Sequence, residues 1–329
     1  MFLLLGSIKA QNFTQFSFSH KLGNYYNPSL IALDGHTKAK LLHRSQWVNY
    51  NYTTEVNPRP LTQLVTLEHP ISFFSKSISS EKNEALGLSI LNDNIGIVNQ
   101  INLQLALAKK IKLSETKGIG FGLSLGLLSQ RIKVSDFTSV ESNDPTIQEL
   151  INSNTLIEPS LSAGFQYYGS KNNFGLAFNN LLSSDTKGYI LSQKTLFFNF
   201  KTHFILSPTL ELFPLINLIS DFKNHSYIIG VNSRITILQT YLDFNLLARQ
   251  AVSQSQKNVW SFGNNDVIVQ LGFPEIPQLP IGLYYSFDYV SLGVAAKSNV
   301  SHELMLSYQL GKKKKYEGKE LFSPRYKYN

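Results

Sequence analysis

The sequence contains no cysteine among its 329 residues. This absence excludes a disulfide scaffold, a thiolate metal site and a cysteine nucleophile. Charged residues are also scarce, at 16% of the chain, compared with about 25% in typical soluble proteins. Hydrophobic residues reach 43% and aromatic residues 12%. A composition this rich in apolar side chains excludes a disordered chain.

Long hydrophobic runs are missing as well. The longest apolar stretches, Thr195–Phe200 and Phe204–Leu206, are interrupted by Asn199, Lys201 and His203. Because a membrane-spanning helix needs about 18 or more apolar residues in a row, the sequence excludes a helical membrane protein.

The first ten residues have some features of a secretory signal peptide. An apolar stretch, Phe2–Leu5, precedes the small residue Ala10, but no basic residue comes before the apolar stretch. We therefore interpret residues 1–10 as a truncated signal peptide, with an ordinary N-terminus as the alternative.

A period of two residues is the main feature of the chain. In Gly118–Leu127 and Val300–Leu310, apolar side chains alternate with small or polar ones, which is typical of a strand with one apolar face. Most such segments are about ten residues long, the length that a tilted strand needs to cross a bilayer, whereas sandwich strands average about five or six. The sequence therefore predicts an all-β fold, an antiparallel up-and-down transmembrane β-barrel, and a soluble sandwich is the less favoured alternative. Fourteen segments are predicted as strands: 36–47, 60–69, 85–92, 99–113, 117–135, 157–168, 172–180, 194–206, 208–218, 224–236, 238–249, 259–273, 280–290 and 300–310.

The connections between these strands alternate in length. Short turns such as Ser114–Lys117 and Gly169–Lys171 alternate with longer polar segments such as Asn92–Val98, and Ile71–Glu84 and Ile219–Lys223 are exceptions. Bacterial barrels have short turns on the periplasmic side and longer loops outside. We therefore expect both termini in the periplasm, with residues 11–35 as a periplasmic segment, 36–310 as the barrel and 311–329 as a basic periplasmic tail.

Asp136–Leu156 is the longest predicted extracellular loop. It carries acidic residues but no lysine or arginine, and long loops in compact structures are often functional. We expect it to bind a partner, directly or through Ca²⁺, although a merely solvated loop remains open. No other cofactor is expected. Its acidic residues are Asp136, Glu141, Asp144 and Glu149.

The predicted inner face of the barrel is small or polar. Glycines in 118–126 leave room in the lumen for a plug, a loop or a partner segment, and Asp243, Asn245 and Asp288 are predicted to face it. Aromatic residues near strand ends are expected to form an interfacial girdle. They are Tyr167, Tyr168, Phe197, Phe198, Tyr284, Tyr285 and Tyr308.

No catalytic set is recognisable. The seven histidines are scattered and lack the spacing of a metal site. Ser301, His302 and Glu303 are the residue types of a catalytic triad, but neighbours on a strand point to opposite faces. We therefore expect no enzymatic activity, with His302 in the aromatic girdle.

Positive charge is concentrated at the C-terminus. A periplasmic tail does not meet nucleic acid, so we expect it to dock on a periplasmic partner or an anionic surface, and a solvated tail is an equal alternative. The basic residues are Lys312, Lys313, Lys314, Lys315 and Arg325.

Several motifs together resemble the PorP/SprF family of outer-membrane proteins, which is associated with type IX secretion in Bacteroidetes-type bacteria. This resemblance implies a role in secretion and gliding motility, either as an anchor for the C-terminal domain of a secreted adhesin at the cell surface or as a contact for periplasmic or lipoprotein components of the secretion system. A passive or selective pore is the alternative function. The matching segments are Asn27–Leu33, His43–Tyr50, Leu86–Gly96, Pro159–Tyr168, Asn173–Leu182, Ile281–Tyr289, Ser301–Tyr308 and Ser323–Tyr326.

Overall fold

The structure of the protein is a computed structural model. It describes the chain from residue 14 to residue 310 with gaps. The described residues are 14–31, 35–48, 59–72, 83–96, 98–132, 155–182, 193–222, 224–237, 240–254, 260–276, 279–292 and 300–310. No helix among them is long and apolar enough to cross a membrane.

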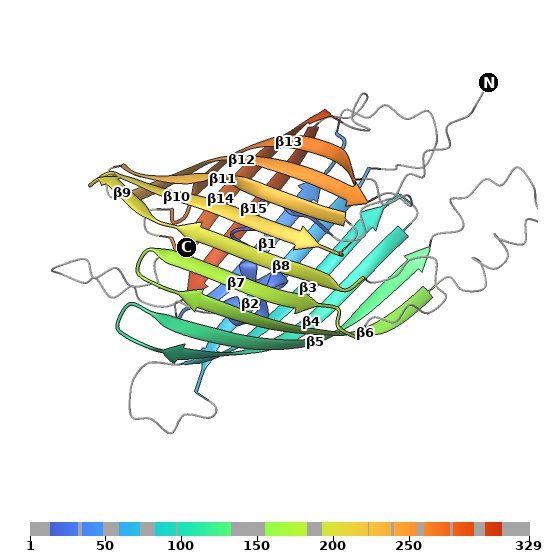
Figure 1. The fold of residues 1–329 in the computed structure, drawn as a ribbon, viewed down its shortest axis with the longest axis horizontal. Helices are drawn as coiled ribbons and strands as arrows, with labels where there is room; N and C mark the ends of the chain where they lie inside the picture. The colour runs from blue at the N-terminus through green and yellow to red at the C-terminus, as the bar shows by residue number, and fades with distance from the viewer. Residues whose placement is uncertain are drawn as a thin grey trace, which may run out of the picture.

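One antiparallel sheet closes on itself to form a barrel (Figure 1). Each strand pairs with its neighbours in sequence, and the ring closes where β1 pairs with β15, from Thr37 opposite Leu310 to Ser45 opposite His302. The strands are β1 (Thr37–Ser45), β2 (Leu61–Ile71), β3 (Glu84–Ile95), β4 (Val98–Lys112), β5 (Gly118–Ile132), β6 (Thr155–Tyr168), β7 (Asn172–Asn179), β8 (Thr195–Thr202), β9 (Phe204–Ser207), β10 (Leu210–Ser220), β11 (Asn224–Ile237), β12 (Thr240–Gln254), β13 (Trp260–Phe273), β14 (Ile281–Leu292) and β15 (Val300–Leu310).

The barrel wall has fourteen positions, because β8 and β9 are two parts of one interrupted strand. Both pair with β10, and His203 lies between them. His203 Nε2 is 2.9 Å from Glu211 Oε2, and the His203 ring stacks on Phe213. The predicted fourteen-stranded barrel is confirmed, and the break at His203 is the one interruption of the predicted strand 194–206.

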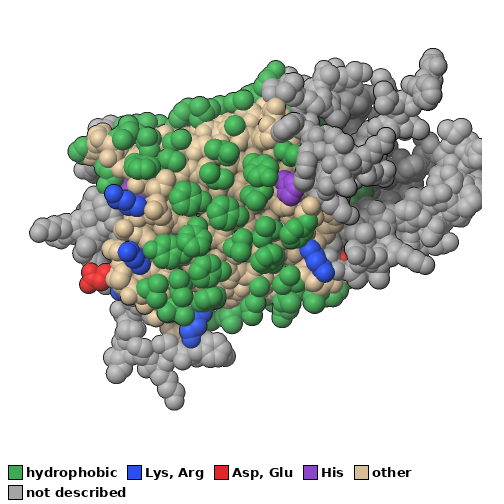
Figure 2. Space-filling model, in the orientation of Figure 1, with side chains coloured by type: hydrophobic (Ala, Val, Ile, Leu, Met, Phe, Trp, Pro, Cys, Tyr) green, Lys and Arg blue, Asp and Glu red, His purple; other side chains and the backbone are tan. Residues whose placement is uncertain are grey.

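The two faces of the wall have opposite chemistry. On β5 the side chains of Leu123 and Leu125 are 60% and 64% exposed, whereas Ser124 between them is 4% exposed. The same alternation places apolar side chains over the outer surface of the strands (Figure 2). A hydrocarbon environment favours such a surface, and closure of the sheet pairs all backbone groups that would otherwise face lipid.

The two ends of the barrel differ. We call the end where β1 begins and β15 ends the short-turn end, and the opposite end the long-loop end. At the short-turn end, Leu113 and Ser114 N–H groups both donate to Lys117 O. At the long-loop end, the predicted longer segment Asn92–Val98 is a tight turn. Strand β3 extends to Ile95 and β4 begins at Val98, and Gly96 between them has φ +57°. The predicted exceptions, Ile71–Glu84 and Ile219–Lys223, keep their unexpected lengths.

The predicted aromatic girdle is only partly outside. Tyr285 and Tyr308 are 41% exposed on the outer face, but Tyr168, Phe197 and Tyr284 are buried in the lumen. The physical reason is strand alternation, because adjacent aromatic residues such as Tyr284 and Tyr285 must face opposite sides.

The N-terminal segment lies inside the barrel. Residues 14–31 contain the short helix α1 (Gly23–Tyr26) and the 3₁₀ turn η1 (Pro28–Leu30), drawn in blue within the ring of strands (Figure 1). Their side chains form the hydrophobic core together with inward-facing wall residues. The prediction of a periplasmic segment over 11–35 is therefore corrected for residues 14–31. The segment lies in the lumen because burial of the apolar side chains of Phe16, Phe18, Leu22 and Tyr26 is favourable, and inward-facing wall residues provide apolar partners there.

Candidate functional site

The lumen and the segment that fills it form the candidate site, and we call residues 14–31 the plug. At the long-loop end, Thr14 Oγ1 donates to Asp93 Oδ2 of β3 at 2.8 Å. Towards the short-turn end, Lys21 Nζ is 2.8 Å from Asp243 Oδ2 of β12. Ile31 packs near the beginning of β3, against Ala85. The plug therefore extends along the lumen from one end to the other. The described chain begins at the long-loop end and ends at Leu310 at the short-turn end, and the termini themselves lie outside the described residues.

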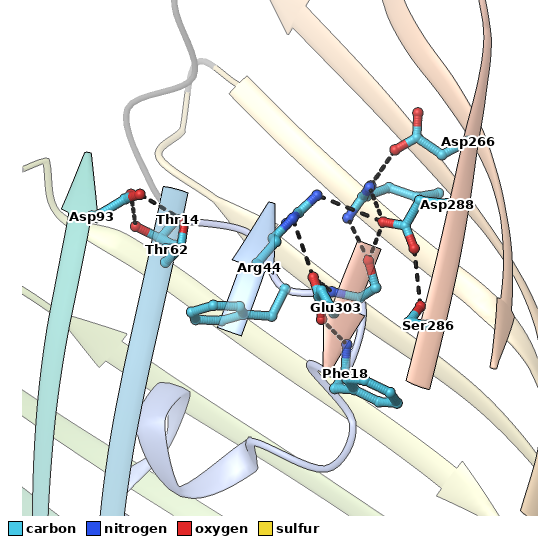
Figure 3. Close-up of polar contacts among 12 residues, drawn as sticks. Thr14, Phe18, Arg44, Thr62, Asp93, Asp266, Ser286, Asp288 and Glu303 are labelled. Atoms are coloured by element: carbon cyan, nitrogen blue, oxygen red, sulfur yellow. Dashed lines mark hydrogen bonds and ion pairs between the residues drawn. The ribbon is translucent and has the colours of Figure 1, made fainter. Parts of the chain in front are cut away.

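The backbone of the plug is held at Ser17 and Phe18, and Figure 3 shows the contact between Phe18 and Glu303. Glu303 of β15 accepts hydrogen bonds from Ser17 N at 2.7 Å and Phe18 N at 3.2 Å. Gln270 Nε2 of β13 donates to Ser17 O at 2.8 Å, and Ser17 Oγ donates to Asp288 Oδ2 of β14. Side chains from three strands thus provide hydrogen-bond partners for the backbone and side-chain groups of this turn of the plug.

Two arginines hold the acceptors in place. Arg44 Nε of β1 is 3.2 Å from Glu303 Oε1, and Arg44 Nη2 is 3.6 Å from Asp288 Oδ2. Arg249 of β12 pairs with Asp288 at 3.0 Å and donates from Nε to Asp266 at 2.6 Å. We call these five side chains, all at most 6% exposed, the charge cluster. Buried charges of this kind are tolerated only when they are paired.

Glycines of the wall make room for the plug. A Cβ atom on Gly122 would overlap the backbone of Pro28, and one on Gly164 would overlap Asn27 Oδ1. A Cβ atom on Gly87 would lie 2.7 Å from Ile31 Cδ1. The expectation that small residues in 118–126 leave space in the lumen is met at Gly122, and the occupant is a segment of the same chain.

Aromatic contacts complete the seat of the plug. The Tyr26 ring stacks on Phe197 of β8 at 4.9 Å between centroids, and Phe18 meets Tyr284 of β14 edge to face at 6.1 Å. Tyr26 Oη donates to Thr14 O at 3.1 Å within the plug. Two of the three predicted girdle residues that face inward, Phe197 and Tyr284, thus pack against rings of the plug.

The structure places the three predicted lumen residues against the plug or its holders. Asp243 binds Lys21 of the plug and, at 2.8 Å, Arg234 Nε. Asn245 Nδ2 donates to Gln270 Oε1 at 2.7 Å and lies 3.4 Å from His20 Nε2. Asp288 belongs to the charge cluster.

Other predicted site residues are elsewhere. Asp136, Glu141, Asp144 and Glu149 of the loop, and Lys312, Lys313, Lys314, Lys315 and Arg325 of the tail, lie outside the described residues. Ser301 and Glu303 face the lumen while His302 faces outward, so these three residues do not form a triad, as expected. Tyr285 Oη is 2.6 Å from His302 Nδ1, and among the described residues no group of three acidic or histidine side chains could hold a metal ion.

Sequence reasoning missed the plug and most of its holders. Arg44, Arg249, Gln270 and Glu303 each lie on the inner face of a predicted strand, and a polar inner face is the signal that could have found them. Residues 16–22 of the plug do alternate between ring or apolar side chains and polar ones, but this alternation covers only seven residues and does not indicate that the segment lies inside the barrel.

The closed sheet, the apolar outer belt and the polar, filled lumen define a bacterial outer-membrane β-barrel protein. Solved structures support this fold. The chain is similar to the CymD monoaromatic hydrocarbon channel, with a TM-score of 0.52 and 10% identity over 91% of this chain and 94% of that one. It is also similar to a deltaS2 mutant of the TodX monoaromatic hydrocarbon channel, with a TM-score of 0.51 and 9% identity over 87% and 93%. At such low identity the likeness concerns the fold alone.

The family is defined by sequence. The family model described as type IX secretion system membrane protein PorP/SprF matches residues 7–308, so the chain belongs to this family. No curated protein was found to match the chain.

Proposed function

We propose that the protein is a non-enzymatic docking barrel of the type IX secretion system, which holds a secreted adhesin at the cell surface through the adhesin's C-terminal domain. Membership of the PorP/SprF family supports a role in secretion. The absence of a spaced catalytic set from the described residues is consistent with a binding role. Gliding motility is the cellular process in which such an adhesin would act.

The filled lumen is the single observation that favours docking over a passive pore. The plug contacts wall residues from β3 to β15 and is fixed by the charge cluster. Its core residues Phe16, Phe18, Leu22 and Tyr26 are almost fully buried against inward-facing wall residues, so the plug occupies space in the lumen that a passive pore would need for solutes. Docking through loops on a rigid scaffold needs no open path.

The two ends of the barrel serve different partners in this proposal. The acidic loop Asp136–Leu156 connects β5 to β6 at the long-loop end and would meet the adhesin, directly or with Ca²⁺. The tail with Lys312–Lys315 and Arg325 follows β15 at the short-turn end and would meet periplasmic or lipoprotein components of the secretion system. This assignment places the short-turn end in the periplasm, as the loop lengths of bacterial barrels favour.

The test is surface retention of the adhesin in cells that lack the protein. We expect the adhesin to be lost from the surface and recovered in the medium, and complementation with the full chain to restore its display. Co-purification of the adhesin's C-terminal domain with the barrel provides the direct measurement. Unchanged display in the deletion strain would contradict the proposal.

Shortening residues 138–155 to a tight turn tests the loop. We expect weaker adhesin retention while the barrel keeps its heat-resistant folded form. The matched control shortens residues 184–191, which belong to the β7–β8 connection at the same end. Equal retention in both variants would remove the acidic loop from the interface.

A further inference from the structure

A polar patch lies on the outer face of the barrel wall, at the line where β1 pairs with β15. It consists of side chains that point away from the lumen on four neighbouring strands, β15, β1, β2 and β3. We call it the seam patch, because it covers the line where the ring closes. Its members are His302, His43, Ser45, Gln63 and Asn92.

The strand register joins these residues into one surface. Gln63 is opposite His43 on one side and opposite Asn92 on the other, and Ser45 is opposite His302. Side chains directly opposite each other on paired strands have Cβ atoms about 4.5–5.5 Å apart. Asn92 Nδ2 also donates to Gln63 Oε1 at 3.5 Å. The patch is therefore continuous across the four strands.

The seam patch belongs to the part of the wall that faces lipid. Counted from the short-turn end of each strand, His43 is the seventh residue and the other four members are ninth residues, whereas a tilted strand needs about 9–11 residues to cross a membrane. The next row towards the short-turn end is entirely apolar. It consists of Leu306, Leu41, Val65 and Ile90.

Other sectors of the wall are apolar or aromatic over the same length. On β6 and β12, the outward side chains within nine residues of the short-turn end include no amide and no imidazole. They are Leu161, Ala163, Phe165 and Tyr167 on β6, and Leu242, Phe244, Leu246 and Ala248 on β12. A uniform polar rim would appear on these strands too, so the seam patch is a local feature.

Polar groups at these positions need hydrogen-bond partners that lipid tails do not offer. The described residues form no hydrogen bond to the His43 ring. Tyr285 Oη lies 2.6 Å from His302 Nδ1, and His302 Nε2 has no partner among the described side chains. Ionisable side chains within membrane spans are rare and mark functional surfaces.

The chemistry of the seam patch is complementary to itself. Amides, hydroxyl groups and uncharged imidazole rings each donate and accept hydrogen bonds. None of the five members carries a carboxylate, an ammonium or a guanidinium group. A phosphate-bearing headgroup would be matched by cations, which the patch lacks.

The membrane restricts how a second copy can meet this surface. Two copies inserted in the same direction can be related by a two-fold axis along the membrane normal, which brings each residue to the depth of the same residue in the other copy. Polar groups around His43 and Gln63 then meet polar groups, and apolar groups around Leu41 and Val65 meet apolar groups. A different membrane protein would need a polar patch at the same depth, whereas a second copy has one by symmetry.

We propose that the seam patch is the interface of a symmetric dimer of this chain in the membrane. Hydrogen bonds between the two patches would satisfy the imidazole and amide groups that otherwise face lipid. This inference does not depend on adhesin docking, because it requires only that the barrel is inserted in a membrane.

The first test is the oligomeric state of the unmodified full-length protein in phosphatidylcholine vesicles. Donor-labelled and acceptor-labelled copies are mixed, and energy transfer is measured as the protein is diluted with lipid. We expect transfer that saturates at the level of a dimer. Transfer no greater than that of randomly distributed monomers would overturn the proposal, whatever the variants do.

Cysteine cross-linking locates the interface. Because the chain has no cysteine, Leu41→Cys introduces a single thiol on the outer face of β1, beside the seam patch. Leu125→Cys on the outer face of β5 is the matched control, since Leu41 and Leu125 are 50% and 64% exposed. We expect oxidation to join two copies at position 41 at least tenfold faster than at position 125. Equal rates would contradict an interface at the seam.

Substitutions test the polar contacts. His43→Leu with Gln63→Leu keeps bulky side chains but removes the hydrogen-bonding groups, and we expect the Kd of the dimer to rise at least tenfold. His69→Leu is the matched control, because His69 is an exposed outward histidine of β2 outside the patch, and its Kd should stay within twofold. His43→Gln keeps a donor and an acceptor and should stay within about threefold. An unchanged Kd in the double Leu variant would contradict a polar interface.

Vesicles that contain lipopolysaccharide distinguish a second copy from a glycolipid headgroup. We expect the same dimer with and without lipopolysaccharide. Loss of energy transfer when lipopolysaccharide is added, together with its saturable binding to the protein, would assign the patch to a headgroup and overturn the proposal.

Discussion

Single side chains in this protein reverse the usual pattern of burial. In the charge cluster, Arg44, Asp288 and Glu303 are at most 2% exposed, where a soluble protein would place apolar groups. Each charge has a partner of the opposite sign, and Glu303 also binds backbone N–H groups of the plug. The network therefore depends on every member, because removal of one cation leaves a carboxylate buried without compensation.

Arg44→Met tests this dependence. We expect the free energy of unfolding to fall by about 3–5 kcal/mol, the cost of breaking a buried ion pair from one side, measured by urea titration in lipid vesicles. The control is Arg131→Met, since Arg131 is exposed on β5, and a change within about 0.5 kcal/mol is expected. Equal effects of the two substitutions would show that the cluster does not stabilise the fold.

The sequence predicts which side chains face the lumen but not what they contact there. Alternation along β12 and β14 places Asp243, Asn245 and Asp288 on the inner face, and they lie there. Their partners Ser17, His20 and Lys21 could not be predicted, because long-range contacts position the segment that contains these residues.

At the scale of the strands, positions on the outer face differ in how deep they lie in the membrane. Leu105 lies at the middle of β4 and is 62% exposed, whereas Ile111 lies one residue before its end and is 42% exposed. An arginine on the lipid face of a barrel costs about 2–4 kcal/mol at the bilayer centre and about 0–1 kcal/mol near the interface.

Leu105→Arg and Ile111→Arg measure this gradient. We expect the first substitution to lower the free energy of unfolding in lipid vesicles by about 2–4 kcal/mol and the second by at most about 1 kcal/mol. The two residues share a strand and a face, so their difference reports depth alone. Equal costs would mean that the middle of β4 does not lie at the centre of the hydrocarbon layer.

Another prediction concerns the fit between β5 and η1. Because the chain has no cysteine, Ser29→Cys introduces a single thiol in the buried η1 turn. Gly122→Ala in this background adds a methyl group that overlaps Pro28, so we expect maleimide labelling of position 29 to become at least tenfold faster. Gly126→Ala is the matched control, because its Cβ would meet wall residues Leu103 and Gln104 and not the plug. Slow labelling in both variants would show that the plug tolerates the added atom.

Strands were the part of the fold that the sequence predicted best. Their two-residue period depends on local geometry alone, so fourteen segments could be located from the residues. The break at His203 could not, because it results from contacts of this ring with Glu211 and Phe213 on the neighbouring strand. The tight β3–β4 turn was not predicted, because the polar residues at the ends of β3 and β4 were interpreted as part of a longer connection.

At the scale of the whole molecule, the plug is expected to block the passage of ions through the lumen. We expect the full-length protein in planar bilayers to show little conductance, and deletion of residues 14–31 to produce conducting channels. Glu303→Ala removes the acceptor of two plug N–H groups and should give intermittent openings. This second variant keeps the prediction testable if the deletion variant does not fold. Large steady conductance of the unmodified protein would favour the pore over the docking barrel.

The location of the charge cluster also determines the order in which the protein can assemble. Arg44 is on the first strand and Glu303 on the last, so their ion pair crosses the line where the barrel closes. The same Glu303 binds Ser17, which is 286 residues away in sequence. The plug is therefore synthesised first but cannot complete its native contacts until the final hairpin, β14 and β15, has formed. Seating of the plug and sealing of the ring are consequently expected to occur in a single late step of folding, with the unsealed barrel as the intermediate that precedes it.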